Sequence, residues 1–281
     1  MKIGAHVSAA GGLHNAPQMA AELGLECFQF FSRPPQGGMA KPITEEDEVK
    51  FKEICVKHNF TDYYIHTPYV LNLASDKAEV RHRTASIIRS DLERASQLGA
   101  TAVMTHLGSA SKINDEKLGV KLVIDGLKEV LSGYEGTAQP LIEMSAGAGM
   151  VIGDTFEELA TIIEGVADDR IGLCFDTAHA FASGYDLRNE ETVNETLRWF
   201  DDIVGLEKLI LSHANDSLVE LGSHKDRHEH IGAGQIGLTG FRALISHYKF
   251  RNLNLILETP PGDGRTNDIA VLKKLRDELT N

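Results

Sequence analysis

Hydrophobic and polar positions follow one repeated order along the chain. A short apolar run is followed by a polar or glycine-containing break, and then by a longer segment with apolar residues at helical spacing. We count eight such rounds, and the short apolar runs bounded by turn residues predict buried strands. The predicted strands are Lys2–Val7, Glu26–Phe31, Asp62–His66, Thr101–His106, Gln139–Glu143, Ile171–Phe175, Lys208–His213 and Leu253–Glu258.

Each predicted strand is followed by a helical pattern. The predicted helices are Leu13–Leu23, Glu45–His58, Lys77–Leu98, Asp115–Leu131, Phe156–Glu164, Glu191–Val204, Thr239–His247 and Asp268–Leu279. Buried parallel strands need helical crossovers on the outside, so eight consecutive strand–helix units predict a closed parallel (β/α)8 barrel. No linker-like tract or abrupt change of composition divides the chain, and we therefore expect a single domain over residues 1–281.

Composition fits a globular protein, with 42% hydrophobic and 25% charged residues. No apolar run approaches the roughly 18 residues that span a membrane, and the start, MKIGAHVSAAGG, lacks the apolar core of a signal peptide. We expect a cytoplasmic protein with no membrane partner. A formal net charge of −13 argues against a generic basic nucleic-acid binder, although bound cations can reverse the local field of a site.

The ends of the predicted strands carry most of the candidate chemistry. In a barrel of this kind the carboxyl ends of the strands ring one mouth, where active sites are built. Seven of the eight end residues are His, Asp or Glu, types that are depleted from strands unless paired or metal-bound. In chain order, the end residues are His6, Phe30, His66, His106, Glu143, Asp176, His213 and Glu258. The loops add His179, Asp226, Arg227 and His228.

Taken singly, such a histidine or carboxylate is more often a structural group satisfied by hydrogen bonds. Taken together, several carboxylates at one mouth would repel each other unless cations lie between them. Histidine and carboxylate ligands without thiolates suit Zn²⁺ or Mn²⁺ in an open catalytic site. One ion cannot use nine ligands, so two or three ions are indicated. The candidate metal ligands are His66, His106, Glu143, Asp176, His179, His213, Asp226, His228 and Glu258.

The remaining histidines fall in predicted helices or polar loops, where solvation or a local hydrogen bond is expected; they are His14, His58, His82, His224, His230 and His247. His6 ends the first strand without an evident partner. We expect it to support a metal ligand or to contact the substrate.

Several stretches resemble, in chain order, the signatures of the endonuclease IV family. They are KIGAHVSAAGG, HTPYVLNLA (His66–Ala74), THLGS (Thr105–Ser109), LIEMSAG (Leu141–Gly147), GLCFDTAHAFASGYD (Gly172–Asp186), SHANDS (Ser212–Ser217), DRHEHIGAGQIG (Asp226–Gly237) and LILETP (Leu255–Pro260). The resemblance runs nearly end to end. It implies a xylose-isomerase-like TIM barrel and a zinc-dependent apurinic/apyrimidinic endonuclease of DNA repair.

The resemblance also implies three zinc ions per chain, with Mn²⁺ a further candidate at one site. His66 and His106 would hold one ion, and Glu143 would bridge it to a second held by Asp176, His213 and Glu258. His179, Asp226 and His228 would hold the third. Glu143 and Glu258 are the expected catalytic carboxylates. The substrate would be duplex DNA with abasic sites, which the family cuts on the 5′ side of the lesion to leave a 3′-hydroxyl and a 5′-deoxyribose phosphate. A second substrate would be DNA with blocked 3′ ends, which the family trims.

The chain departs from the family in the loop SRPPQGGM (Ser32–Met39), which lacks the aromatic residue that follows the family's DNA-wedging side chain. Arg33 or Gln36 is our candidate for that wedge. Tyr69 matches a family position that contacts substrate, and it could equally be an ordinary aromatic of the barrel rim. Arg227, between two expected ligands, would contact a phosphate or pair with Glu229.

Two other functions stay open at this stage. A metal-dependent sugar isomerase or epimerase on the same barrel would need only Glu143, Asp176, His213 and Glu258. A non-catalytic damaged-DNA binder could keep the zinc for structure, although structural zinc sites are normally closed and rich in cysteine. We expect a monomer, because a DNA-engaging barrel mouth needs one chain.

Overall fold

Eight parallel strands close into a barrel, as the sequence predicts. The computed structural model describes residues 1–38 and 40–279; Met39, the last residue of the SRPPQGGM loop, and the last two residues of the chain lie outside this part. Around the barrel the order is β1, β10, β7, β6, β5, β4, β3, β2, and β1 closes it by pairing Ala5 with both Leu257 and Phe28. The barrel strands are β1 (Ile3–His6), β2 (Cys27–Phe31), β3 (Tyr63–His66), β4 (Ala102–Thr105), β5 (Gln139–Glu143), β6 (Gly172–Asp176), β7 (Leu209–His213) and β10 (Asn254–Leu257).

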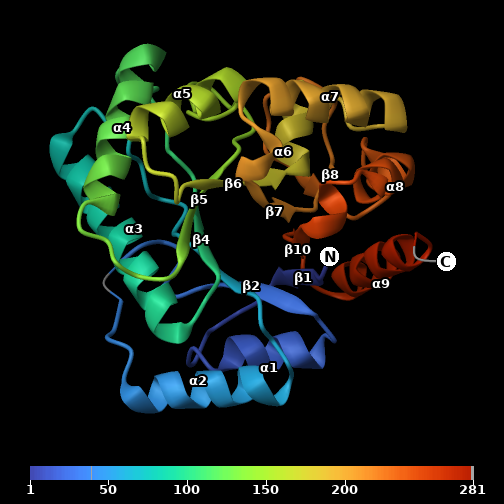
Figure 1. Cartoon of the computed structure of the whole chain (residues 1–281), viewed down its shortest axis with the longest axis horizontal. Helices are drawn as coiled ribbons and strands as arrows, with labels where there is room; N and C mark the ends of the chain where they lie inside the picture. Colours follow the sequence, from blue (N-terminus) through green and yellow to red (C-terminus); the bar gives the residue numbers. More distant parts are fainter. Residues whose placement is uncertain (39, 280–281) are drawn as a thin grey trace.

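Helices surround the barrel on its outside (Figure 1). They are α1 (Asn15–Glu22), α2 (Glu45–Lys57), α3 (Ala78–Leu98), α4 (Glu116–Leu131), α5 (Phe156–Val166), α6 (Thr177–Ala182), α7 (Glu190–Ile203), α8 (Gly237–Ser246) and α9 (Asp263–Asp277), with two short 3₁₀ turns, η1 (Leu206–Lys208) and η2 (Phe250–Asn252). None of the helices in the described part of the chain combines the length and apolarity that crossing a membrane requires.

Three features of the structure differ from the sequence prediction. Helix α9 begins at Asp263 rather than at Asp268, directly after Gly262, whose φ of 115° ends the Pro/Gly turn. The loop after β6 forms the short helix α6, because the Asp176 side chain caps it by accepting the His179 N–H at 2.9 Å. The long loop after β7 contains an antiparallel hairpin, β8 (Asp216–Ser217) with β9 (His228–Glu229).

The helix boundaries follow from local side-chain chemistry. Thr44, Asp115, Thr155 and Asn189 each accept a backbone N–H from the first turn of the helix that they precede. Such caps stabilise a helix by roughly 1 kcal/mol each. Helix α3 ends at Gly99, where φ is 81°, a conformation that glycine adopts without strain.

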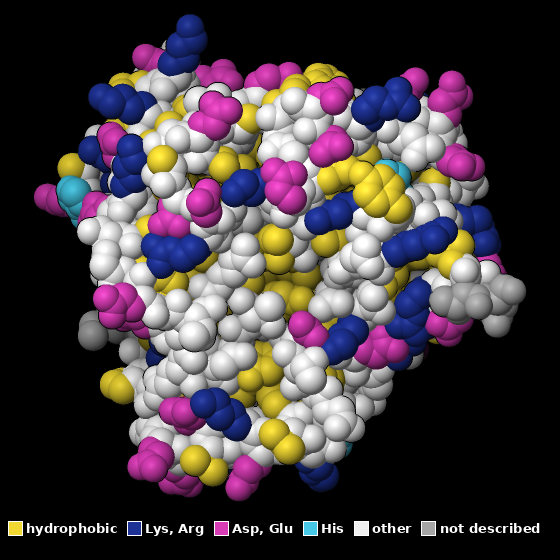
Figure 2. Space-filling view, viewed as in Figure 1, with side chains coloured by type: hydrophobic (Ala, Val, Ile, Leu, Met, Phe, Trp, Pro, Cys, Tyr) yellow, Lys and Arg dark blue, Asp and Glu magenta, His cyan; other side chains and the backbone are white. Residues whose placement is uncertain are grey.

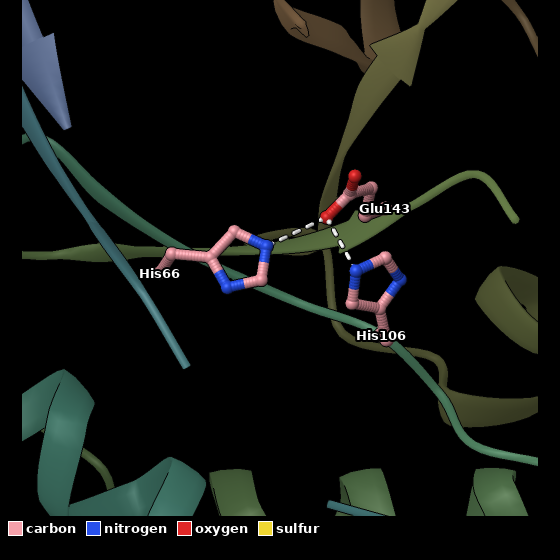
Figure 3. Close-up of side chains that lie close together, drawn as sticks. All are labelled: His66, His106 and Glu143. Carbon is pink, nitrogen blue, oxygen red and sulfur yellow. Dashed lines mark hydrogen bonds and ion pairs between the residues drawn. The ribbon is translucent and has the colours of Figure 1, made fainter. Parts of the chain in front are cut away.

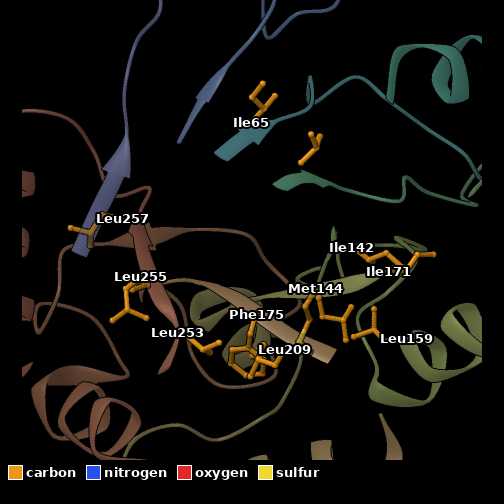
Figure 4. Packing of buried hydrophobic residues seen from close by; sticks show 14 of the residues in the cluster. Ile65, Ile142, Met144, Leu159, Ile171, Phe175, Leu209, Leu253, Leu255 and Leu257 are labelled. Carbon is orange, nitrogen blue, oxygen red and sulfur yellow. The ribbon is translucent and has the colours of Figure 1, made fainter. Parts of the chain in front are cut away.

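Side-chain alternation along the strands divides the core into two layers. Outward-facing residues such as Ile65, Ile142, Phe175 and Leu257 pack under the helices (Figure 4). Inward-facing residues fill the barrel as a separate cluster, made of Cys27, Tyr64, Ala102, Met104, Leu141, Cys174, Leu211 and Ile256. The barrel is therefore a packed core rather than a pore, and the next inward position along each strand lies above this core, at the mouth.

Candidate metal centre

Each barrel strand places one polar residue at the mouth, at the inward position that follows the interior core. Along the chain, these residues are His6, Gln29, His66, His106, Glu143, Asp176, His213 and Glu258. Seven of the eight are the strand-end residues that the sequence singles out. On the second strand the inward residue is Gln29, whereas the predicted end residue Phe30 faces outward into the hydrophobic core.

His66, His106 and Glu143 form the first group of possible ligands. Glu143 Oε2 lies 3.0 Å from His66 Nε2 and 3.4 Å from His106 Nε2, and both rings point at this oxygen (Figure 3). His66 Nδ1 lies 2.6 Å from the Thr67 carbonyl oxygen, which can only accept a hydrogen bond. Nδ1 of neutral His66 therefore carries the proton, and Nε2 keeps its lone pair free for a cation.

Glu143, Asp176, His213 and Glu258 form the second group. His213 Nδ1 lies 3.0 Å from Glu143 Oε1, 3.2 Å from Glu258 Oε2 and 3.7 Å from Asp176 Oδ2. Glu143 thus turns one oxygen to each group, so its carboxylate is placed to bridge two cations.

Asp176, His179 and His228 form the third group, and Asp226 lies beside it. The Nε2 atoms of His179 and His228 both lie 3.3 Å from Asp226 Oδ1. These two Nε2 atoms are buried, and neither has a hydrogen-bond partner among the described residues. His179 Nδ1 is engaged by the Met144 carbonyl oxygen at 2.8 Å, which again leaves Nε2 as the free nitrogen.

The charges of the mouth perturb its titratable groups strongly. Burial raises the pKa of Glu143, but the neighbouring histidines, His106 and His213 first, reverse this and hold it well below its usual value. Burial opposes a proton on His179, yet the charges of Asp176 and Asp226 raise its pKa to about 10. Asp226 responds in the opposite sense: burial raises its pKa, but the nearby His179, followed by the charge of His228, lowers it to about 2.

The arrangement fits divalent cations. Nitrogen and oxygen donors converge in three groups, and the two buried imidazole nitrogens of the third group, without a hydrogen-bond partner among the described residues, are free to bind a cation. Such a donor set suits Zn²⁺ or Mn²⁺. Eight of the nine predicted ligands lie in these groups. The ninth, Asp226, lies 3.3 Å from the third group, and its side chain is 55% exposed.

The predicted substrate contacts have different surroundings. Tyr69 is 61% exposed at the rim, and its ring packs against Phe31 and His66 at centroid distances of 5.1 Å and 5.7 Å. Gln36 and Arg227 are exposed, and Arg227 Nη1 donates to the Asp226 carbonyl oxygen. All three remain accessible to a ligand at the mouth.

Arg33 does not suit the wedge role proposed for it. Its side chain is buried, with Nε donating to Asp91 Oδ1 at 2.9 Å and Nη2 donating to Ser90 Oγ at 3.0 Å. The Arg33 guanidinium is therefore paired with α3 inside the protein rather than available at the surface. Arg94 also holds the start of this loop, donating to the Ser32 carbonyl oxygen at 2.7 Å. Gln36 is the better candidate for a DNA contact.

His6 and Gln29 are linked, and sequence reasoning missed this pair. Gln29 is fully buried and contacts His6, His213 and Glu258 through its amide. The alternation of inward and outward residues in CFQFF indicates that Gln29 faces the mouth, because Gln29 follows the interior residue Cys27 by two positions.

A second missed residue is Asn215, also fully buried. Its Nδ2 donates to Asp176 Oδ2 at 2.8 Å, and its Oδ1 accepts the Glu258 N–H at 2.8 Å. It therefore supports two of the candidate ligands from the end of β7.

Two of the remaining histidines have local partners. His230 Nδ1 lies 2.7 Å from Asp268 Oδ2, and His82 Nδ1 lies 2.8 Å from Glu129 Oε2. Neither pair includes a candidate metal ligand, so both agree with the structural role expected for them.

Comparisons with known proteins agree with the geometry. A family model described as a xylose isomerase-like TIM barrel matches residues 17–275. A relative from Clostridium beijerinckii, named probable endonuclease 4, is 40% identical over 277 residues, which cover 98% of this chain and 99% of the relative. The solved structure of endonuclease IV from Thermus thermophilus is similar with a TM-score of 0.88 and 31% identity, covering 99% of this chain and 100% of that chain. The fold is shared by a D-tagatose 3-epimerase-like protein. That structure is 20% identical with a TM-score of 0.79, covering 100% of this chain and 98% of that chain.

Proposed function

Because the chain belongs to the endonuclease IV family, we propose that it is a DNA-repair endonuclease that hydrolyses the phosphodiester on the 5′ side of abasic sites in duplex DNA. The products are a 3′-hydroxyl and a 5′-deoxyribose phosphate, and the proposal includes trimming of blocked 3′ ends. We also propose that residues 1–281 act as one domain, as a monomer, in the cytoplasm. All nine candidate ligands come from one chain, which supports a monomeric active unit.

The observation that carries the proposal is the third ligand group. The buried Nε2 atoms of His179 and His228, which have no hydrogen-bond partner in the described part of the chain, converge with Asp226 beside a second group of four possible ligands. Phosphodiester hydrolysis benefits from cations near the attacking water, the phosphate and the leaving oxygen. Three groups of ligands at one mouth meet this requirement.

The mouth residues have two proposed roles, metal ligand and catalytic carboxylate. The three groups would hold three zinc ions, which when bound lower the pKa of water and neutralise charge on the phosphate. Glu143 and Glu258 are the proposed catalytic carboxylates. Both stay ionised because, although burial raises their pKa values, the neighbouring histidines lower them well below the usual range. As anions they can accept a hydrogen bond from the attacking water and orient it.

In the proposed reaction the water oxygen bonds to phosphorus, and the bond from phosphorus to O3′ breaks. One proton of the attacking water ends on O3′, which leaves as the 3′-hydroxyl. An abasic nucleotide costs less to extrude from the duplex than a stacked and paired one, so entry into a pocket at the mouth is itself selective. Tyr69, Gln36, Arg227 and His6 are the proposed substrate contacts, at the rim and next to the ligands.

The surface charge bears on how DNA is held. On the face shown in Figure 2, acidic side chains are interspersed with basic ones and no broad basic stripe is visible. With a net charge of −13, long-range attraction of a DNA duplex is weak. We propose that cations at the mouth, together with the rim residues, supply the local attraction for the lesion.

A sugar isomerase or epimerase is the second candidate, favoured only by the group Glu143, Asp176, His213 and Glu258, which would hold one metal. That function leaves His66, His106, His179 and His228 without a role. A non-catalytic damaged-DNA binder would share all the ligands, and only turnover separates it from the enzyme.

The test is incision of a labelled duplex that carries one tetrahydrofuran abasic analogue, with zinc-loaded protein and without added magnesium. We expect a single cut on the 5′ side of the lesion and no cut in an undamaged duplex. His228→Ala should lose the activity, while the control His82→Ala, which alters an exposed histidine paired with Glu129, should keep it. Intact lesion duplex after incubation with fully zinc-loaded protein would overturn the endonuclease proposal.

A further inference from the structure

Gln29 is the one neutral amide in the ring of eight inward residues at the mouth, and none of the proposed catalytic steps uses it. We propose that Gln29 is a positioning residue: it fixes the tautomer of His213 and the orientation of Glu258, and so sets the affinity of the cation site that these two form with Glu143 and Asp176. This inference rests on the proposed metal-dependent function.

The amide of Gln29 contacts two candidate ligands of one site at the same time. Its Oε1 lies 2.8 Å from His213 Nε2, and its Nε2 lies 2.6 Å from Glu258 Oε1. The Nε2 group also lies 2.9 Å from His6 Nδ1. Gln29 is fully buried, so water does not compete for these contacts.

Only one orientation of the amide is chemically consistent. The ionised carboxylate of Glu258 can only accept hydrogen bonds, so the NH₂ group of Gln29 must face it. The carbonyl oxygen Oε1 then faces His213 and can only accept, so His213 Nε2 must carry a proton. In a neutral imidazole this leaves Nδ1 with the lone pair, and Nδ1 is the atom that faces Glu143, Asp176 and Glu258.

The second N–H of the amide acts on His6 by the same logic. In a neutral His6 ring, Nδ1 accepts from the Gln29 NH₂ group, so Nε2 carries the proton. Arg265 Nη1 donates to the His6 carbonyl oxygen at 2.8 Å and holds the backbone at this point. Glu258 thus fixes the orientation of the Gln29 amide, and that amide fixes which ring nitrogen of His213 and of His6 carries the proton.

An apolar side chain at position 29 would remove these constraints without removing a ligand. His213 Nε2 would lose its buried acceptor, and the proton could move to Nδ1, the atom needed for the cation. Glu258 would lose the donor that holds Oε1 and could turn away from the site. Loss of such a supporting contact typically weakens metal affinity about 10- to 100-fold.

The experiment measures zinc affinity by competition with a chromophoric chelator in the full-length protein. Gln29→Met keeps the volume and flexibility of the side chain and removes both hydrogen-bonding ends. The matched control is Asn254→Leu. It removes a barrel amide at the other end of the strands, where Asn254 accepts the Lys2 N–H at 2.9 Å and donates to Tyr64 Oη at 2.9 Å.

We expect one of the three zinc ions to bind about 10- to 100-fold more weakly to Gln29→Met, with all three unchanged in Asn254→Leu. The visible absorption bands of the cobalt-substituted protein should change only in Gln29→Met, because they report the geometry of the ligands. If Gln29→Met fails to fold, Gln29→Asn, one methylene shorter and unable to reach both partners, serves in its place with the same expectation.

Wild-type affinity and unchanged cobalt bands in the position-29 variants would overturn the positioning role, and so would an equal loss of zinc in Asn254→Leu. Neither outcome touches the proposed function, because the wild-type protein would still hold three ions. A wild-type protein that binds no ion at Glu143, Asp176, His213 and Glu258 would overturn the proposed function and this inference together.

Discussion

Replacing Asp216 by asparagine tests how the third ligand group is held in place. Asp216 is fully buried at the start of the hairpin β8–β9, and His228 lies on the second strand of that hairpin. Its carboxylate accepts five backbone N–H groups. Oδ1 accepts Ser217 and Ile236, and Oδ2 accepts Gly232, Gly234 and Gly237, at distances of 2.8–3.2 Å.

The magnitude follows from counting these bonds. Asparagine keeps one oxygen, and its best orientation directs that oxygen at the three glycine N–H groups. Its NH₂ group then faces the N–H groups of Ser217 and Ile236, which are left without an acceptor. A buried unsatisfied donor costs about 1–3 kcal/mol, so Asp216→Asn should lower the free energy of unfolding by roughly 4 kcal/mol. The loosened hairpin should also release the zinc ion proposed at His179, Asp226 and His228 before the two proposed at the other groups.

Urea unfolding and zinc content measure the two effects. The control is Asp115→Asn, which changes an exposed Asp that accepts one backbone N–H, from Leu118 at 3.0 Å, at the start of α4. Asparagine caps a helix as well as aspartate does, so this variant should stay within about 0.5 kcal/mol of wild type. The reasoning is refuted if Asp216→Asn unfolds within about 1 kcal/mol of wild type and keeps three zinc ions.

Three further outcomes follow. Burial is the main cause that raises the pKa of Glu158 from 4.5 to about 8, and the neighbouring Glu116 and Asp154 add to it. The folded protein therefore holds the Glu158 proton more tightly than the unfolded chain does. The stability that this proton contributes is present below pH 4.5 and is lost as the pH rises to about 8. The stability advantage of Glu158→Gln over wild type should grow by at least about 1 kcal/mol from pH 5 to pH 8 in denaturant titrations, and a constant difference would argue against this environment. Arg33→Ala should lower the melting temperature without changing the affinity for lesion DNA beyond the effect of stability. Gln36→Ala should leave the melting temperature unchanged and weaken binding of the abasic duplex. Weaker DNA binding by Arg33→Ala at an unchanged melting temperature would show that Arg33 reaches DNA. Dialysis against a chelator should lower the melting temperature, and added zinc should restore it, since ions that bind only the folded state stabilise it by mass action; identical melting curves would speak against the metal centre.

Much of the fold could be predicted from the hydrophobic pattern. The strand boundaries agree because each barrel strand is a compact apolar run, and β5 coincides with its predicted range, Gln139–Glu143. Helix α6 escapes the pattern because it has only six residues, most of them small, and its start depends on the Asp176 cap. The start of α9 escapes because proline and glycine precede it.

The candidate site divides in the same way. Six of the nine candidate ligands could be proposed because His, Asp and Glu are unusual at the ends of buried strands. The other three, His179, Asp226 and His228, lie in loops, and the family resemblance supplied their grouping. Gln29 could not be found by that argument, since the end of the apolar run points to Phe30; the side-chain alternation of β2 points to Gln29 instead. The burial of Arg33 depends on Asp91, which lies 58 positions away on α3, and this distant contact has no local signal.

The most direct test of the account is an anomalous diffraction measurement at the zinc absorption edge on crystals of the zinc-loaded protein. We predict three peaks at the mouth of the barrel: one at His66 and His106, one at Asp176, His213 and Glu258 with Glu143 between these two, and one at His179, Asp226 and His228. A single peak at Glu143, Asp176, His213 and Glu258, with nothing beside His179 and His228, would contradict the three-ion centre and would point to a one-metal sugar enzyme.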